Sequence, residues 1–443
     1  MRRVLTLALL YAAMQLVIPL DTTHGPGSTT LLIFGFLVLA AYTSGELATL
    51  VRLPKITGYL LAGLLFGPAV MGIVSSESVI ELEAVSRLAV AIIAFMAGAE
   101  LRWGELKERA RTILTLLTSE MILSFLGIMF VLWSLRAHVP FLGGVSDLQA
   151  LALSALFASV TIVHSPAVTM ALLTETRAQG PVARTTLGVV LVADVVVVLV
   201  FSGILTLARS VVPAPGDGTT LSAGVIAWEI LGSLLVGALL GGGVALYMRF
   251  VQRELMLFAI VVAFLGAEIA RIAHVETLLT LLTAGFVTEN VTRSGGRELL
   301  HAMERSSVPI FVVFFALAGA SIHIGELVSL WPLALAVVGV RAAAIFTGTR
   351  IGSRIVGAAP VVKQNVWLGL ISQAGVAIGL ASILATAYPS RGSEMQTLVL
   401  SVIAINEIAG QILFSIALRR SGEVVEDGRQ QAAESREPLR EQG

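Results

Sequence analysis

The chain of 443 residues is 56% hydrophobic and 13% charged, with no net formal charge. Soluble globular domains contain roughly 25% charged residues, so this composition indicates a membrane protein. A neutral charge balance provides no basic field for nucleic acid. The chain has no cysteine, which excludes disulfides, a thiolate metal site and a cysteine nucleophile.

Fourteen apolar segments follow one another along the chain, and runs of about 20 apolar residues are typical of transmembrane helices. They lie at 3–20, 30–50, 55–73, 80–101, 109–135, 149–174, 183–209, 221–249, 254–272, 275–292, 305–323, 327–350, 362–388 and 394–418. We therefore predict an all-α membrane protein of about 14 transmembrane helices.

The two ends of the chain need separate interpretation. Arg2 and Arg3 precede the first apolar segment, but no small-residue cleavage site follows it, so we expect residues 1–20 to stay as a helix. From Ser421 onward the chain is polar, and residues 419–443 are predicted to be a disordered cytoplasmic tail.

The loop charges orient these helices, because Lys and Arg collect in cytoplasmic loops. When the loops are assigned alternately from an inside N-terminus, 20 basic residues fall inside. The outside ones are only Arg87, Arg136, Arg209, Arg271 and Arg391. Both termini are therefore predicted to be cytoplasmic, and we expect an integral protein of a bacterial inner membrane.

Asp194 lies eleven residues into segment 183–209, near the middle of the membrane. A charge at this depth costs about 2.5–3.5 kcal/mol on insertion scales, so it usually serves a function. Desolvation favours the protonated carboxyl group and a bound cation favours the ionised one, so proton and cation compete. Asp194 is therefore predicted to bind an ion or a proton. The alternative is a carboxylate paired with another helix for packing specificity.

Three more charges lie inside predicted helices. Arg341 is about fourteen residues into segment 327–350, too central for its charge to reach the interface easily. Glu120 and Glu407 are in the middle of their segments. Either glutamate could neutralise Arg341, and the alternative for both is a hydrogen bond inside the bundle.

Two segments contain helix breaks. The first reads Thr161-Ile162-Val163-His164-Ser165-Pro166, and proline removes a backbone donor and interrupts a helix. His164 beside it can exchange a proton near neutral pH, although a lone histidine is more often a satisfied core residue. The second is Ser372-Gln373-Ala374-Gly375. Broken helices in two halves of a membrane protein indicate a transporter site.

Three stretches carry a family resemblance. Residues 53–68 read L-P-K-I-T-G-Y-L-L-A-G-L-L-F-G-P, residues 97–101 read A-G-A-E-L, and residues 309–319 begin with P-I-F and end with F-F-A-L-A-G. In this order they resemble the monovalent cation/proton antiporter superfamily, closest to its Kef and Nap-like sodium (or potassium)/proton exchangers. The resemblance covers about 30–418, nearly the whole chain.

The resemblance implies inverted repeats with two crossed broken helices, and a 13-helix antiporter core to which segment 3–20 adds one helix. Residues 109–209 and 327–418 would form the ion-transporting core. Residues 221–249 would be a linker helix, and 30–101 with 254–323 a scaffold that forms a homodimer. The bilayer, the cation and the proton are the expected partners, with no cofactor.

The resemblance also implies roles for the candidate residues. Asp194 would bind the transported Na⁺ or K⁺, together with Thr161 and Ser165. The proton and charge partners would be His164, Arg341, Glu120, Glu407 and Gln373.

This chain departs from the family pattern at the site itself. Relatives usually carry an acidic or amide residue before the aspartate, where this chain has Ala193. They often carry a charge at the second break, where this chain has Gln373. One acidic site rather than two favours one-for-one, electroneutral exchange, unless Glu120, Glu407 or His164 supplies a second titrating group.

Other functions stay open. The same fold could serve a gated K⁺ pathway or an organic-anion carrier, since Arg341 has no carboxylate partner at the first site position. A non-transporting scaffold or sensor is a third possibility, but it would leave Asp194 and Arg341 unexplained. The sequence contains no nucleophile with a base and an orienting group, and no metal-ligand cluster, so we do not expect an enzyme.

Overall fold

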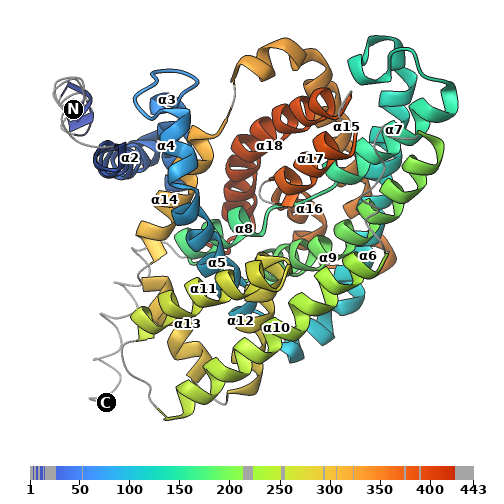
Figure 1. Cartoon of the computed structure of the whole chain (residues 1–443). Helices are drawn as coiled ribbons and strands as arrows, with labels where there is room; N and C mark the ends of the chain where they lie inside the picture. The colour runs from blue at the N-terminus through green and yellow to red at the C-terminus, as the bar shows by residue number, and fades with distance from the viewer. Residues whose placement is uncertain are drawn as a thin grey trace.

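The computed structural model describes residues 26–51, 53–212, 223–250, 255–292, 295–305, 307–322, 324–373, 376–388 and 391–424, with a few isolated positions before residue 15. In these ranges the regular elements are α-helices and short 3-10 helices, with no strand (Figure 1). The predicted all-α class is confirmed for the described residues. The predicted first helix at 3–20 lies mostly outside them.

One group of helices packs through glycines that let backbones touch. It contains α2 (Pro26–Ala48), α3 (Lys55–Phe66), α4 (Ser76–Glu81), α5 (Glu83–Ala99), α10 (Ala223–Phe250), α11 (Leu255–Ile272), α12 (Thr277–Val291), α13 (Gly295–Arg305) and α14 (Ser307–Ala320). A Cβ on Gly63 of α3 would lie 1.9 Å from the Ala316 carbonyl oxygen of α14, and one on Gly319 of α14 would lie 2.0 Å from the Leu60 carbonyl oxygen. Small residues at such contacts bring apolar helices close enough to hold in lipid, where no hydrophobic force joins them.

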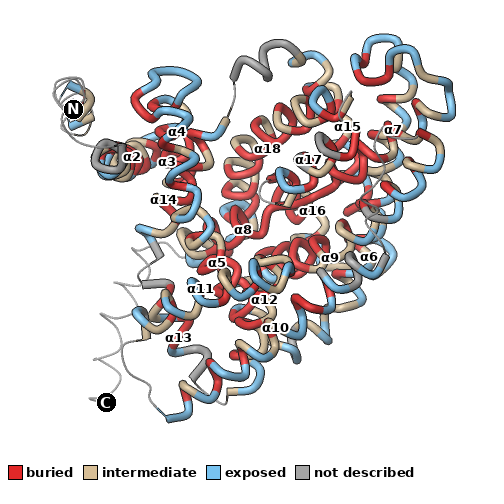
Figure 2. Tube along the Cα trace, in the orientation of Figure 1, coloured by how far each residue is buried: buried red, intermediate tan, exposed pale blue. Residues whose placement is uncertain are grey.

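A second group surrounds the two helix breaks. It contains α6 (Trp103–Ser134), α7 (Asp147–Thr161), α8 (Pro166–Thr176), α9 (Pro181–Val211), α15 (Ile324–Ile355), α16 (Pro360–Gly369), α17 (Val376–Ala387) and α18 (Gly392–Arg420). Short 3-10 helices lie at Thr49–Val51, Arg136–His138 and Pro140–Leu142. Buried residues concentrate along α8, α16 and α18 (Figure 2). The proposed division into core, linker and scaffold stays a prediction.

Length and composition make seven of the described helical segments long and apolar enough to cross a membrane. Three shorter apolar helices add to them, at Lys55–Phe66, Thr277–Val291 and Val308–Ala320. Large apolar side chains are exposed on the outside, among them Leu239 at 69% and Phe250 at 74%. Exposed apolar surface on this scale is typical of a face that contacts lipid or another protein. The total of 14 helices stays a prediction.

Both predicted breaks are present. Residues 162–165 separate α7 from α8, and residues 370–373 follow α16 before α17 begins at Val376. Pro166 is the first residue of α8, where the missing amide donor of proline is harmless. Each apolar run is therefore two short helices, and the backbone groups at the interruptions need other partners.

The start of α9 is capped by a residue from the other end of the chain. Glu423 is 8% exposed, and its carboxylate accepts hydrogen bonds from the amides of Val182 and Ala183, both at 2.8 Å. Carboxylates stabilise helix N-termini because the exposed amides carry partial positive charge. The residue before Pro181 is a glycine, Gly180, which has no side chain to cap with. At its start the predicted tail 419–443 differs from the structure, because Arg419 and Arg420 end α18 and Glu423 is buried. Residues 425–443 of this prediction lie outside the described residues.

Candidate functional site

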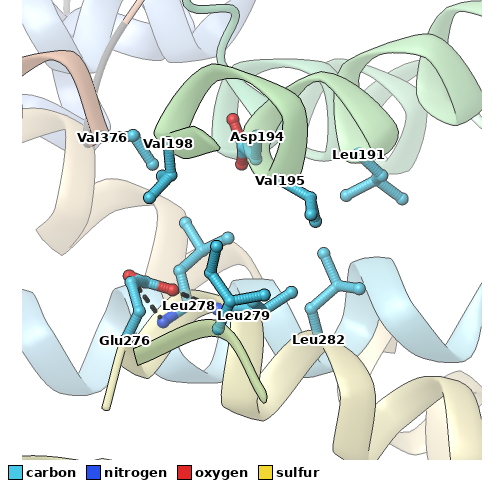
Figure 3. Close-up of a pocket in the computed structure, with 10 residues that line it drawn as sticks. Leu191, Asp194, Val195, Val198, Glu276, Leu278, Leu279, Leu282 and Val376 are labelled. Atoms are coloured by element: carbon cyan, nitrogen blue, oxygen red, sulfur yellow. Dashed lines mark hydrogen bonds between the residues drawn. The ribbon is translucent and has the colours of Figure 1, made fainter. Parts of the chain in front are cut away.

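Asp194 lies in the middle of α9 and is 6% exposed. Neither of its carboxylate oxygens has a hydrogen-bond partner in the described part of the chain. It lines a cavity of about 30 Å³ with residues of α9, α10, α12 and α17, namely Leu191, Val195, Val198, Ile230, Glu276, Leu278, Leu279, Leu282 and Val376 (Figure 3). That volume holds a water molecule or a small dehydrated cation.

Arg341 joins the two helix breaks from α15 and is fully buried. Its guanidinium donates to the carbonyl oxygens of Thr161 at 2.8 Å, Val163 at 2.7 Å and Ile371 at 2.7 Å, with a longer bond of 3.3 Å to that of Leu370. These carbonyls belong to the ends of α7 and α16, where a helix presents partial negative charge. Arg341 therefore neutralises the two broken ends with its own charge.

Glu120 and His164 form a buried pair beside this arginine. His164 Nε2 lies 2.8 Å from Glu120 Oε1, and His164 Nδ1 lies 2.7 Å from the Leu370 carbonyl oxygen. Because a carbonyl only accepts, Nδ1 carries a hydrogen, and one further proton lies between Nε2 and the carboxyl group. The pair is then neutral wherever that proton sits. Arg341 approaches Nδ1 at 3.2 Å, and since both nitrogens are donors this contact adds no bond.

Glu120 and Glu407 were each predicted as a residue that could neutralise Arg341. The structure shows no hydrogen bond from Arg341 to either glutamate among the described residues. The hydrogen bonds of Arg341 go to main-chain carbonyls, while Glu120 binds His164. Glu407 on α18 is 3% exposed, and its Oε1 has no partner among the described residues. The physical reason is that free carbonyls at an interrupted helix compete for a cation, and a sequence pattern does not show them.

Gln373, in the second break, bridges α7 and α18. Its amide nitrogen donates to the Thr161 carbonyl oxygen at 2.7 Å, and its amide oxygen accepts from Asn406 Nδ2 of α18 at 2.7 Å. Asn406 was not singled out from the sequence, although a polar Asn-Glu pair in the middle of an apolar helix was a visible signal. The second break is thus tied both to the first break and to α18.

The hydroxyls of Thr161 and Ser165 are engaged locally. Thr161 Oγ1 donates back to carbonyl oxygens of α7, at 3.1 Å to Ala158 and 3.2 Å to Phe157. Ser165 Oγ accepts from the Val168 amide at 3.2 Å and caps α8. Neither residue is among those lining the Asp194 cavity. Their role as cation ligands stays a prediction.

Comparison with known proteins decides the family. Residues 34–419 match the family described as sodium/hydrogen exchanger, transmembrane. The chain belongs to the sodium/hydrogen exchanger family. This confirms the predicted membership of the monovalent cation/proton antiporter superfamily, and it makes the exchanger an integral membrane transporter for cation/proton exchange, not an enzyme.

Two named relatives support this assignment. The exchanger is 24% identical over 360 residues to the probable Na⁺/H⁺ antiporter GerT of Bacillus cereus, covering 78% of this chain and 88% of GerT. Its fold resembles that of the sodium proton antiporter MjNhaP1 from Methanocaldococcus jannaschii at pH 8, with a TM-score of 0.64 and 18% identity, covering 88% of this chain and 96% of the other. An electron-microscopy structure of MjNhaP1 gives a TM-score of 0.67 at 17% identity over 89% and 98%.

Proposed function

We propose that the exchanger moves one Na⁺ or K⁺ against one proton by alternating access, with Asp194 as the residue that binds them in turn. The observation that carries this proposal is the unpartnered carboxylate of Asp194 in a small buried cavity. A bare carboxylate at this depth is costly, so it needs either a proton or a cation. Two ligands that compete for one buried group are what coupled exchange requires.

The surroundings favour a single ion site. Arg341 is occupied by the carbonyls of both breaks, and Glu120 with His164 makes a neutral pair. Asp194 is then the carboxylate of this cavity whose oxygens have no hydrogen-bond partner among the described residues, in keeping with the alanine at position 193. One such group supports one-for-one exchange without net charge movement.

The hydrogen bonds from Arg341 to main-chain carbonyl oxygens also argue against the organic-anion carrier. An anion would have to compete with main-chain carbonyl oxygens for this guanidinium, because each of its three nitrogens already donates to one. We further propose a homodimer in a bacterial inner membrane with both termini cytoplasmic, the orientation that the loop charges favour.

Proton flux in proteoliposomes tests the proposal. A pH dye reports dissipation of a preset pH gradient when Na⁺ or K⁺ is added to vesicles that hold wild type, Asp194→Asn or Asp147→Asn. Asp147 is the matched control, since its side chain is 74% exposed at the start of α7. We expect proton flux from wild type and Asp147→Asn and none from Asp194→Asn. The cation whose addition starts the flux is identified as the substrate.

The other outcomes are equally clear. Flux that survives in Asp194→Asn would remove this residue from the cycle and favour a passive pathway. A wild type that responds to neither cation would refute cation exchange and return attention to the anion carrier, with Arg341 as the next residue to change.

A further inference from the structure

A second carboxylate lines the cavity of Asp194. Glu276 is the residue that caps the start of α12, across the cavity from α9. The wall between the two acidic groups is built from Val195, Val198 and leucines of α12 (Figure 3). Those side chains offer no ligand to an ion. The cavity therefore has an acidic group on each side and an apolar wall between them.

Glu276 is held in a fixed position. Its carboxylate accepts hydrogen bonds from the amides of Leu278, at 3.0 Å, and Leu279. Its main-chain amide donates to Ser233 Oγ of α10 at 2.9 Å, and the same hydroxyl lies 3.2 Å from its carbonyl oxygen. The negative charge is thus placed at the cavity by two neighbouring helices and does not swing freely.

The elements around the cavity identify the side of the membrane that it approaches. Val198 lies one turn beyond Asp194 on the C-terminal side of α9, Ile230 in the early turns of α10, and Glu276 before the first turn of α12. In a bundle whose helices alternate in direction, the end of α9 lies on the same side of the membrane as the starts of α10 and α12. With cytoplasmic termini this is the outer side, opposite the Glu423 cap.

We propose that Glu276 is the outer entry residue for the transported cation. It attracts a hydrated monovalent cation to the mouth of the cavity, from which the cation reaches Asp194. A fixed charge in a cleft with low-dielectric walls raises the local concentration of counter-ions and the rate at which they arrive. This inference rests on the proposed function, because it presupposes that a cation binds at Asp194.

Helix capping alone does not account for a glutamate here. The residues preferred at this position are Asn, Asp, Ser, Thr and Gly, and most of them are uncharged. A neutral side chain would supply the same kind of bond to α12, without the attraction between a carboxylate and the partial positive charge of the helix start. The place of this charge in the cavity of Asp194 is the observation that points to a second role.

Kinetics on each face of the membrane test the proposal. Glu276→Gln keeps one oxygen, which can accept one of the two capping bonds, and removes the charge. Glu268→Gln is the matched control, because Glu268 is an exposed glutamate of neighbouring α11, paired with Arg271 and absent from the cavity lining. Both variants and wild type are placed in proteoliposomes sorted by orientation, and Na⁺ or K⁺ is varied on one face at a time.

We expect the KM for the cation added at the outer face to rise about 3- to 10-fold in Glu276→Gln. The KM at the inner face and the maximal rate should stay within twofold of wild type, and Glu268→Gln should match wild type on both faces. High ionic strength should shrink the difference, since it screens the attraction.

An unchanged outer KM, or an equal rise on both faces, would overturn the proposal and leave Glu276 as a helix cap. The two failures are distinguishable. Asp194→Asn abolishes exchange from both faces if the proposed function holds, whereas Glu276→Gln changes one face only. Flux that survives in Asp194→Asn would refute the proposed function, and the passage from Glu276 to Asp194 would be refuted with it. Flux abolished in Asp194→Asn beside an unchanged outer KM in Glu276→Gln would refute the Glu276 proposal alone.

Discussion

Replacing Arg341 with lysine removes the planar fork that joins the two helix breaks. The guanidinium makes three short bonds, to Thr161, Val163 and Ile371, from three different nitrogens. Lysine keeps the charge but places all its donors on one nitrogen at the end of a flexible stem. It can serve one of these carbonyls well, so two of the three bonds are lost, although the Thr161 carbonyl keeps its bond from Gln373 Nε2.

The size of the loss follows from the bonds that disappear. A hydrogen bond to a charged group contributes about 1.5–3 kcal/mol to stability, so losing two lowers the free energy of unfolding by about 3–6 kcal/mol. The assay is an SDS titration of the micelle-solubilised protein, followed by circular dichroism of the helices. Transport should fall as well, because the breaks lose their common anchor.

Arg350→Lys is the matched control on the same helix. The Arg350 guanidinium lies over the Phe346 ring at 4.4 Å and makes no comparable set of carbonyl bonds. A cation–π contact of this kind contributes about 0.5–2 kcal/mol, and lysine keeps part of it. If Arg341→Lys costs no more than Arg350→Lys, the fork does not hold the breaks together and the reasoning is wrong.

Three further outcomes are expected. Gly63→Ala should lower the free energy of unfolding by about 1–3 kcal/mol in the same titration, because its Cβ would lie 1.9 Å from the Ala316 carbonyl oxygen. Gly242→Ala on α10 is the control and should cost nothing, since a Cβ there would have nothing within 4 Å. Equal losses in the two variants would contradict the close packing of α3 and α14. Glu423→Ala should cost about 0.5–2 kcal/mol by uncapping α9, and Glu394→Ala, an exposed first-turn glutamate of α18, serves as its comparison. One-for-one exchange should run at the same rate with and without an imposed membrane potential in proteoliposomes, and a potential-dependent rate would show that another group carries a proton.

Local chemistry made much of the fold predictable. Pro166 cannot donate to the preceding turn, so the first break was visible in the sequence, and Gln373 with Gly375 marked the second. Asp194 stood out because a carboxylate in an uninterrupted apolar run has no other ready explanation. These features depend on the neighbouring residues alone.

The partners of these groups could not be predicted in the same way. Which carboxylate meets Arg341 depends on which helix faces come together, and the structure sends Glu120 to His164 and leaves the arginine to main-chain carbonyls. Glu276 escaped notice because it follows a charged stretch between two apolar segments and looks like an ordinary loop residue.

The Glu423 cap also bears on the order in which the molecule is made. Val182 precedes Glu423 by 241 residues. At a synthesis rate of 5–20 residues per second, that distance takes roughly 10–50 seconds. During this time the first amides of α9 have no carboxylate to bind, and they receive one only after α18 has entered the membrane. The N-terminal cap of the helix that carries Asp194 is therefore formed only after α18 has been made, and a truncation before residue 423 would leave the first amides of α9 without this carboxylate.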